Sequence, residues 1–501
     1  MSELSPSSPS SVPCSRIVRR SDGLLHFTGL PSCLTELLDI AAHRYAAREA
    51  VVEVGGPRLT YAQLWTSAAR IAGGLLEQGV SIGDRVAIRI PDSTRWVQAF
   101  LGVLLSGGVP VPVHPGRGPE QLRHIAADSG SILVLDAGTE FPTGTPFIDD
   151  GASPQDSALL FYTGGTTGRP RGVELSHENV LSTIEAVLAA RENRGGDRHA
   201  VLLPLSSGSA CVARMLPILA SGGTVVLVPD PDPDGLLRVL AAERVDRVSV
   251  TAPLARRLAA ASTDAAAVRV LELDDEPVSA ATVIRLQQLF PGAEIVTGWG
   301  MTETGGAGMV FPIAPRPVPA ELLHEGMEFA VTGTGDGSGA GELWCRGPSV
   351  MRGYWADPDG TARTTTGGWL HTGDVVRIGA DGGLRMAGRA ADAVEIPRGV
   401  VYGREVEDAV LDCPGVAEAV AVGVDTPRGP DLGVLVVPEP GVDLRLDTVR
   451  GFLDAPLGHR LPRQLCASAP ALPRGATGRV DRAAVRRWLE TSCSTKEPRP
   501  R

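Results

Sequence analysis

A turn of threonine and glycine residues lies at the end of an apolar run. The run Leu159–Tyr162 predicts a buried strand, and the turn comprises Thr163, Gly164, Gly165, Thr166, Thr167 and Gly168. Glycine lets backbone N–H groups converge on one anion, and threonine hydroxyls add further donors. Arg171, just beyond the turn, adds a positive charge. The segment predicts a phosphate-binding loop; an ordinary glycine-rich loop is the alternative for such a pattern taken alone.

A second cluster follows another predicted strand and combines an aromatic ring with polar groups. Trp299 lies between Gly298 and Gly300, so its ring face could be open to a flat ligand such as a purine. Thr302 offers a hydroxyl to a phosphate. Glu303 offers the hard carboxylate oxygen that Mg²⁺ prefers. A surface turn with a packed tryptophan is the alternative.

A third cluster places an aspartate and an arginine near the end of the region that alternates strand and turn. Asp374 follows Gly373, and its carboxylate could accept hydrogen bonds from two vicinal hydroxyls, as a ribose requires. A simple Asx-turn is the alternative for Asp374. Arg389 could contact ribose or phosphate, and Asp392 lies where two domains are predicted to join.

The elements that must position these clusters are mainly strands alternating with helices. This pattern predicts an α/β fold in which parallel sheets are covered on both faces. Beyond Pro312, short strands with turns predict a β-rich subdomain. Beyond Gly388, the pattern predicts a small α+β domain of roughly 100 residues. The expected organisation is a disordered tail over 1–22, a large domain over 23–388, a small mobile domain over 389–490 and a tail over 491–501.

Composition limits the functional classes of this chain of 501 residues. The net charge of −11 argues against a nucleic-acid binder and against a basic membrane-surface protein. The longest apolar region, Trp96–Val113, is interrupted by Gly107, Gly108, Pro110 and Pro112 and is not expected to span a membrane. The seven cysteines are scattered without CxxC spacing, which predicts neither a disulfide framework nor a zinc site and favours a cytoplasmic location.

In this order, the clusters resemble the motifs of the AMP-forming adenylating enzymes. That family includes acyl-CoA and aryl-CoA synthetases, adenylation domains of nonribosomal peptide synthetases, and firefly-type luciferases. The resemblance runs from about Leu34 to Arg487. It implies that a carboxylate and MgATP are converted to an acyl adenylate and pyrophosphate, usually followed by transfer to a thiol of coenzyme A or a carrier protein.

The resemblance assigns roles by position. Trp299 would stack on adenine, Thr302 would hold the α-phosphate, and Glu303 would bind Mg²⁺. Asp374 would bind the ribose with support from Arg389, and Asp392 would be the hinge between the domains. The expected nucleotide site comprises Thr163, Gly164, Gly165, Thr166, Thr167, Gly168, Arg171, Glu276, Trp299, Thr302, Asp374 and Arg389.

The chain departs from the family at the catalytic lysine. In the segment Leu472–Arg482, Arg479 stands where the family carries a lysine that bridges the carboxylate and the α-phosphate. A guanidinium is a planar fork and an ammonium is a compact point charge, so the two do not bridge equivalently. Arg479 is expected to do a related job beside Thr302 and Glu303 in catalysis; a different first half-reaction and a degenerate activity are the alternatives.

The expected substrate pocket also departs from the family. Asp274 and Asp275 replace residues of a glycine-rich turn, and Ser206 and Ser207 lie where a Phe-His pair is common; Gly298 completes the pocket. An acidic pocket disfavours an organic carboxylate and favours an amine. Aspartates that point to solvent are the alternative.

The segment that serves thiol transfer in the family is altered as well. Glu395 stands where lysine is common, and Gly403 where proline is common. These changes argue against transfer to coenzyme A or a carrier protein.

The sequence thus predicts an ATP- and Mg²⁺-dependent, AMP-forming enzyme that activates a small organic or aryl acid of specialised metabolism. One alternative is an ATP-dependent diazotase that activates nitrite and joins it to an aryl amine. Another is a catalytically weak nucleotide-binding homologue.

Overall fold

The computed structural model describes fourteen segments of the chain: 2–3, 17–163, 169–190, 195–229, 232–261, 267–274, 276–312, 325–333, 339–379, 383–396, 399–426, 429–457, 466–475 and 478–494. Six residues of the predicted site lie outside them: Gly164, Gly165, Thr166, Thr167, Gly168 and Asp275.

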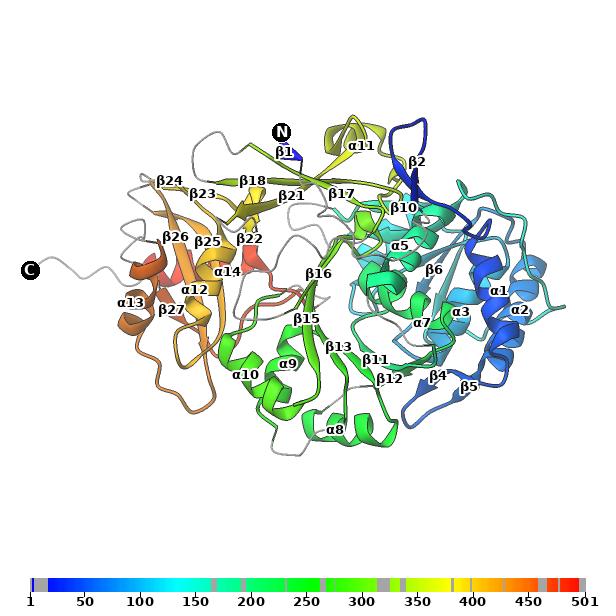
Figure 1. Cartoon of the computed structure of the whole chain (residues 1–501), viewed down its shortest axis with the longest axis horizontal. Coiled ribbons are helices and arrows are strands. Elements are labelled where there is room, and N and C mark those ends of the chain that lie inside the picture. The colour runs from blue at the N-terminus through cyan, green and yellow to red at the C-terminus, as the bar shows by residue number, and fades with distance from the viewer. Residues whose placement is uncertain are drawn as a thin grey trace, which may run out of the picture.

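An eight-stranded sheet forms the centre of the large domain (Figure 1). Its strands, from one edge to the other, are β16 (Met309–Pro312), β15 (Glu294–Trp299), β14 (Val270–Leu273), β13 (Arg247–Val250), β11 (Arg198–Leu202), β12 (Thr224–Leu227), β4 (Glu49–Glu53) and β5 (Arg58–Thr60). The strands from β15 to β4 run parallel, and each edge strand is antiparallel. The carboxyl ends of the parallel strands therefore meet at one edge of the sheet, where ligand sites of such sheets form.

Helices cover both faces of this sheet, as near-continuous apolar strands require. The helices of the large domain up to β15 are α1 (Leu34–Arg44), α2 (Tyr61–Glu77), α3 (Thr94–Leu105), α4 (Pro119–Ser129), α5 (His177–Ala190), α6 (Gly208–Ala210), α7 (Leu216–Ala220), α8 (Pro233–Ala242), α9 (Ala252–Ala259) and α10 (Ala280–Leu289). Leu237 of α8, Leu254 of α9 and Leu286 of α10 pack against Val248 and Leu271 of the strands on one face. Alternate strand residues point to the opposite face, toward the site.

Two smaller sheets flank the segment that carries the predicted phosphate-binding loop. One is parallel: β7 (Val109–Pro112), β6 (Arg85–Arg89) and β8 (Leu133–Asp136). The other is antiparallel: β19 (Gly353–Tyr354), β10 (Gly172–Ser176) and β9 (Ser157–Tyr162). The predicted loop connects β9 to β10, and Tyr162 faces Gly172 across the pair.

A β-rich subdomain follows in the chain. Its sheet comprises β1 (Ser2–Glu3), β17 (Glu328–Thr332), β18 (Ala340–Arg346), β21 (Trp369–Ile378), β20 (Thr365–Thr366) and β22 (Leu384–Arg389). The helix α11 (Pro358–Thr364) lies beside it in Figure 1. The hairpin of β2 (Ile17–Arg19) and β3 (Leu25–Phe27) is a separate two-stranded pair.

The small domain has its own apolar core. Its elements are η5 (Ala390–Asp392), β23 (Val394–Ile396), β24 (Gly399–Val401), α12 (Gly403–Leu411), β25 (Val416–Thr426), β26 (Gly429–Pro438), α13 (Leu446–Leu457), β27 (Cys466–Ser468) and α14 (Arg482–Ser494). Its buried apolar residues, which include Val406, Val434 and Leu489, form clusters separate from those of the large domain. Figure 1 places it at the left, beside the β-rich subdomain.

The predicted fold class is confirmed: the chain has a large N-terminal α/β domain with a β-rich part and a small C-terminal domain. The apolar region Trp96–Val113 divides between α3 and β7. Among the described helices, none combines the length and apolarity that crossing a membrane requires. The domain boundary at 388 and the hinge role of Asp392 stay predictions. Asp392 lies in η5, 3.7 Å from the Nε of Arg482 in α14.

Candidate active site

Three residues predicted for nucleotide binding meet where β15 and β22 end, beside the middle of β21. The indole Nε1 of Trp299 donates a hydrogen bond to Oδ2 of Asp374 at 2.8 Å. Oδ1 of the same carboxylate is 2.7 Å from Nε of Arg389. The antiparallel register places Asp374 and Arg389 opposite each other, so the backbone itself sets this ion pair. Both oxygens of the carboxylate are thereby oriented.

Trp299 is more enclosed than its flanking glycines suggest. Only 7% of the residue is exposed, and its ring meets Phe329 edge-on with centroids 5.9 Å apart. Gly308 approaches so closely that a Cβ there would lie 2.6 Å from the indole ring. The contact of Trp299 with adenine stays a prediction.

A tyrosine joins the predicted phosphate and metal residues. Glu303 lies in the 3-10 turn η2 (Thr302–Thr304) and is buried; its Oε1 accepts a hydrogen bond from the Tyr354 hydroxyl at 2.8 Å. That hydroxyl accepts one from Nη2 of Arg171 at 3.0 Å, and the guanidinium carbon lies 3.8 Å from the ring centroid. Burial and the negative charge of Glu303 raise the pKa of Tyr354, so the phenol remains a donor. Tyr354 carries no sequence signal for this role because it lies outside every glycine-rich motif.

The carboxylate of Glu303 fits a metal that arrives with phosphates. Among the side chains that the structure describes, no group of three or more metal-binding residues converges. Mg²⁺ in nucleotide sites usually takes one or two protein carboxylates and completes its shell with phosphate oxygens and water. A single buried carboxylate beside the predicted phosphate residues is consistent with that arrangement. Thr302, half-buried, precedes it in the same turn, and the N–H of Thr163 donates to the carbonyl of Arg171 at 3.0 Å.

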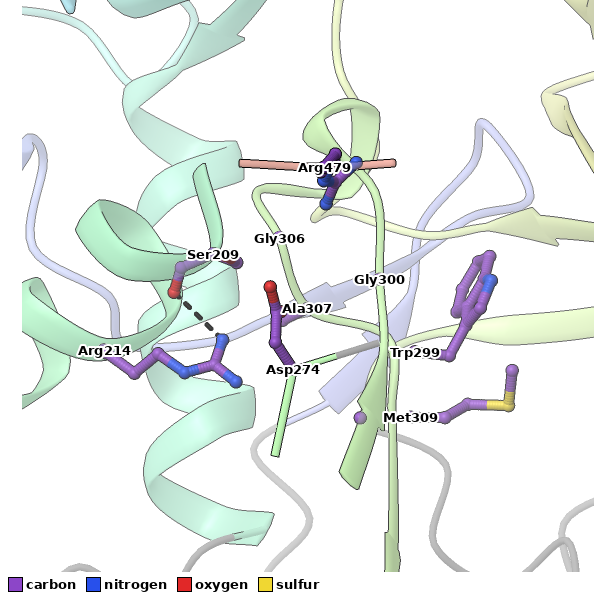
Figure 2. A pocket seen from close by; sticks show the side chains of 10 residues that line it. Ser209, Arg214, Asp274, Trp299, Gly300, Gly306, Ala307, Met309 and Arg479 are labelled. Carbon is purple, nitrogen blue, oxygen red and sulfur yellow. Dashed lines mark hydrogen bonds between the residues drawn. The ribbon is translucent and has the colours of Figure 1, made fainter. Parts of the chain in front are cut away.

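A cavity of about 30 Å³ lies between the large domain and the loop from the small domain (Figure 2). It is lined by Ser209, Arg214, Asp274, Gly298, Trp299, Gly300, Gly306, Ala307, Met309 and Arg479. Asp274, Gly298 and Trp299 were expected here, and Arg479 enters from more than 170 residues further along the chain. The structure thus places the arginine of the lysine position at the predicted substrate site.

The two serines predicted for the pocket are not among the residues that line it. The Ser207 hydroxyl donates to the carbonyl of Pro204 at 2.8 Å and accepts from the N–H of Ala210 at 3.2 Å, so it caps α6. Ser209 lines the cavity instead. The pocket role of Ser206 and Ser207 stays a prediction.

A buried polar network begins at Arg214, which lines the cavity. Arg214, in a π-helical turn, η1 (Cys211–Met215), donates from Nε to Oε2 of Glu272 at 3.2 Å. Arg247 donates to the other oxygen of Glu272 at 3.1 Å, and the Ser249 hydroxyl donates to Oε2 at 3.1 Å. Nε2 of His199 lies 2.7 Å from that hydroxyl. The only sequence signal was a charged residue inside each of two apolar strands.

Charged pairs hold the loop of Arg479 against the large domain. Arg474 lies 3.1 Å from Oε1 of Glu276 in the large domain and 2.7 Å from Oε2 of Glu418 in β25. Arg256 of α9 lies 3.1 Å from the same Glu418 oxygen. Arg474 also donates to the carbonyl of Gly478 at 2.8 Å, beside Arg479. We name Arg256, Glu276, Glu418 and Arg474 the interdomain clasp; Glu276, predicted at the nucleotide, is part of it.

Family models match both parts of the chain. The AMP-binding enzyme model matches residues 38–143 and 136–355, and the model for the C-terminal domain of AMP-binding enzymes matches residues 405–479. Feruloyl-CoA synthase from Amycolatopsis sp is 32% identical over 480 residues, which cover 89% of this chain and 96% of that protein.

Solved structures have the same fold. The anthranilate CoA ligase AuaEII, solved with anthranoyl-AMP, superimposes with a TM-score of 0.84 at 20% identity over 93% of this chain and 98% of that one. The amide bond synthetase McbA from Marinactinospora thermotolerans has a TM-score of 0.80 at 25% identity over 91% and 99% of the two chains. The chain belongs to the AMP-binding enzyme family and is an AMP-forming ligase of the acyl-CoA synthetase type.

Proposed function

We propose that this enzyme activates a small organic or aryl acid with ATP and Mg²⁺, forming an acyl adenylate and pyrophosphate. The observation that carries the proposal is the position of Arg479, a cation from the small domain, at a cavity that Trp299 also lines. Asp374, which accepts from Trp299, and Arg389 complete the nucleotide side. Two of the relatives named above, a feruloyl-CoA synthase and an anthranilate CoA ligase, support an aryl acid.

In this mechanism, an oxygen of the substrate carboxylate attacks the α-phosphorus of ATP. A bond forms from that oxygen to phosphorus while the bond to the pyrophosphate oxygen breaks, and pyrophosphate leaves with the electron pair. The chain must hold the two reactants in line and stabilise the negative charge that develops on the phosphate oxygens. Arg479 and Arg171 supply positive charge, Thr302 supplies a hydroxyl donor, and Asp374 accepts from the ribose hydroxyls.

Glu303 would hold Mg²⁺ at this site. The bound ion neutralises phosphate charge. Tyr354 orients Glu303 by donating to Oε1, and Arg171 orients Tyr354 in turn. Arg171 on the phosphate side and Glu303 on the metal side are therefore linked through the hydroxyl of Tyr354.

The acceptor that we propose is the thiol of coenzyme A. The support comes from relatives that are named for this acceptor, a feruloyl-CoA synthase and long-chain-fatty-acid–CoA ligases. Glu395 and Gly403 oppose it, since the family commonly carries lysine and proline there. An amine acceptor is the alternative, because one structural neighbour is an amide bond synthetase.

Pyrophosphate release tests the proposal. A panel of aryl and aliphatic acids with MgATP should yield pyrophosphate and AMP, and hydroxylamine should trap the activated acyl group without any thiol. Glu303→Gln should lower the rate by at least tenfold, whereas Arg450→Ala, at an exposed pair with Asp447, should leave it unchanged. Normal turnover of Glu303→Gln would remove Glu303 from the mechanism.

Asp274 at the cavity favours one second candidate, the diazotase. A carboxylate in this position suits an aryl amine better than an aryl acid. That activity predicts pyrophosphate release with nitrite plus an aryl amine and with no acid alone. ATP binding without AMP formation under either condition would indicate a nucleotide-binding homologue.

A further inference from the structure

The charged side chains that line the cavity are two arginines and one aspartate. Arg214 comes from η1 in the large domain, Arg479 comes from the loop of the small domain, and Asp274 follows β14. The positive charges outnumber the negative one among these described residues, even though the aspartate alone favours an amine. A ligand with a single negative charge therefore complements this lining better than a cation does.

Arg214 is held by contacts that leave part of its guanidinium for a ligand. Nε donates to Oε2 of Glu272 at 3.2 Å, and Nη1 donates to the carbonyl of Ser209 at 3.0 Å. Among the residues that the structure describes, these are the hydrogen-bond partners of Arg214, so the two N–H donors of Nη2 remain for a ligand. The side chain is only 6% exposed. A donor buried to this extent gains from an acceptor that the ligand brings, because water reaches it poorly.

The cavity is small enough for one group to contact both arginines. Its volume of about 30 Å³ is room for about two water molecules, and therefore for a group as small as a carboxylate. Figure 2 shows Arg479 above the cavity and the guanidinium of Arg214 extending toward it beside Ser209. A carboxylate has two oxygens that accept hydrogen bonds. When one of them attacks the α-phosphorus, the other is left for a donor of the protein.

We propose that Arg214 binds the substrate carboxylate by donating from Nη2 to the oxygen that does not attack phosphorus. Arg479 then serves the attacking oxygen and the α-phosphate. Two arginines would thus divide the bridging task that the family resemblance gives to one lysine, which a planar guanidinium does not perform as compactly as an ammonium. This inference rests on the proposed acid-activating function.

The test measures pyrophosphate release by the wild type with MgATP and ferulate, anthranilate, benzoate or octanoate, and continues with the acid of highest kcat/KM. In Arg214→Met, the KM for that acid should rise at least tenfold, while kcat falls less than threefold and the KM for ATP stays within twofold. This split is expected because the contact with the carboxylate forms on binding and persists during the reaction. A general loss of structure would instead change all three constants.

A KM for the acid within twofold of the wild-type value in Arg214→Met would overturn the inference and leave the proposed function standing. An equal rise of both KM values would also overturn it, since Arg214 would then act on the whole site. Pyrophosphate release by the wild type with none of the four acids, nor with a wider acid panel, would overturn the proposed function and this inference with it.

A second variant and a control separate recognition from folding. Loss of Arg214 leaves the buried carboxylate of Glu272 with Arg247 and the Ser249 hydroxyl, so Arg214→Met is expected to fold. If it does not fold, Arg214→Gln takes its place, because its amide can still donate to Glu272; the same tenfold rise is expected, and the same results would refute it. Arg257→Met, at an exposed arginine of α9, is the matched control and should keep all three constants at wild-type values.

Discussion

Removal of Arg474 should slow the first half-reaction, because the interdomain clasp positions the loop of Arg479. In the clasp, the side chains of Arg474, Glu276 and Glu418 are 21%, 24% and 19% exposed, and that of Arg256 is 12% exposed. Burial lowers the pKa of Arg474, but the two carboxylates outweigh this and the net shift is upward. The guanidinium therefore stays charged, and Arg474→Ala leaves Glu276 and Glu418 with less positive charge beside them.

The size of the effect follows from this partial burial. Exposed ion pairs contribute about 0.2–1 kcal/mol, and removing one partner of a fully buried pair costs about 3–5 kcal/mol. For side chains about one fifth exposed, we expect about 2 kcal/mol, equivalent to about a 30-fold change in an equilibrium constant. Pyrophosphate release by Arg474→Ala should fall by up to about 30-fold, while the Kd for ATP changes little.

The assay is pyrophosphate release at saturating ATP and acid, with Arg450→Ala as control because its pair with Asp447 is 39% and 76% exposed. Added salt should slow the wild type toward the rate of Arg474→Ala, since partly exposed charges are screened. The decisive comparison is the double variant. If Arg474 acts by placing Arg479, Arg474→Ala/Arg479→Ala should be no slower than Arg479→Ala alone. Independent effects that multiply would refute the reasoning.

Three further perturbations test the site and its surroundings. Tyr354→Phe removes the hydroxyl between Glu303 and Arg171. Because hydrogen bonds to charged groups contribute about 1.5–3 kcal/mol, this variant should need about tenfold more Mg²⁺ for half-maximal rate, while its melting temperature stays nearly constant. Burial raises the pKa of Asp92 to about 6, so the free energy of unfolding should fall by at most about 3 kcal/mol as pH rises from 4 to 6. Asp92→Asn can still accept from the N–H of Leu205, so it should unfold at a higher temperature than wild type at pH 8 and lose that advantage at pH 4. Burial lowers the pKa of His177 to about 4, and its Nδ1 accepts from the N–H of Leu34, so the free energy of unfolding should fall by about 3 kcal/mol as pH drops from 6.5 to 4. Urea unfolding of His177→Gln should lack this pH dependence, and parallel pH profiles for both proteins would contradict the assignment.

The strands and the meeting of Trp299, Asp374 and Arg389 were predictable because local patterns specify them. The apolar run before the threonine-glycine turn is β9, and the clusters around Trp299 and Asp374 meet through one hydrogen bond. Their order along the chain matched a known family, which carried the long-range information that periodicity lacks. The antiparallel pairing of Asp374 with Arg389 then followed from the hairpin.

The other contacts of the site were less predictable because the residues that make them come from distant segments. Tyr354 contacts Glu303 from 51 residues away, and Arg214 contacts Glu272 from 58 residues away. Charged residues inside apolar strands usually lie at a surface, and Arg247 and Glu272 are buried only because they compensate each other. Glu276 was assigned to the nucleotide by its position in a motif, whereas in the structure it pairs with Arg474.

The separate core of the small domain has a consequence for the enzyme at high concentration. Its apolar clusters are closed within the domain, with Tyr402 packed near Ala340 and Val375 as a small exception, and the clasp beside Arg479 is charged. If the small domain turned away from the large one at the clasp, the newly exposed surface would carry carboxylates and guanidiniums rather than apolar side chains. Such a charged surface has no apolar patch through which two open molecules could associate. An open form of this protein is therefore expected to stay dispersed in a crowded solution.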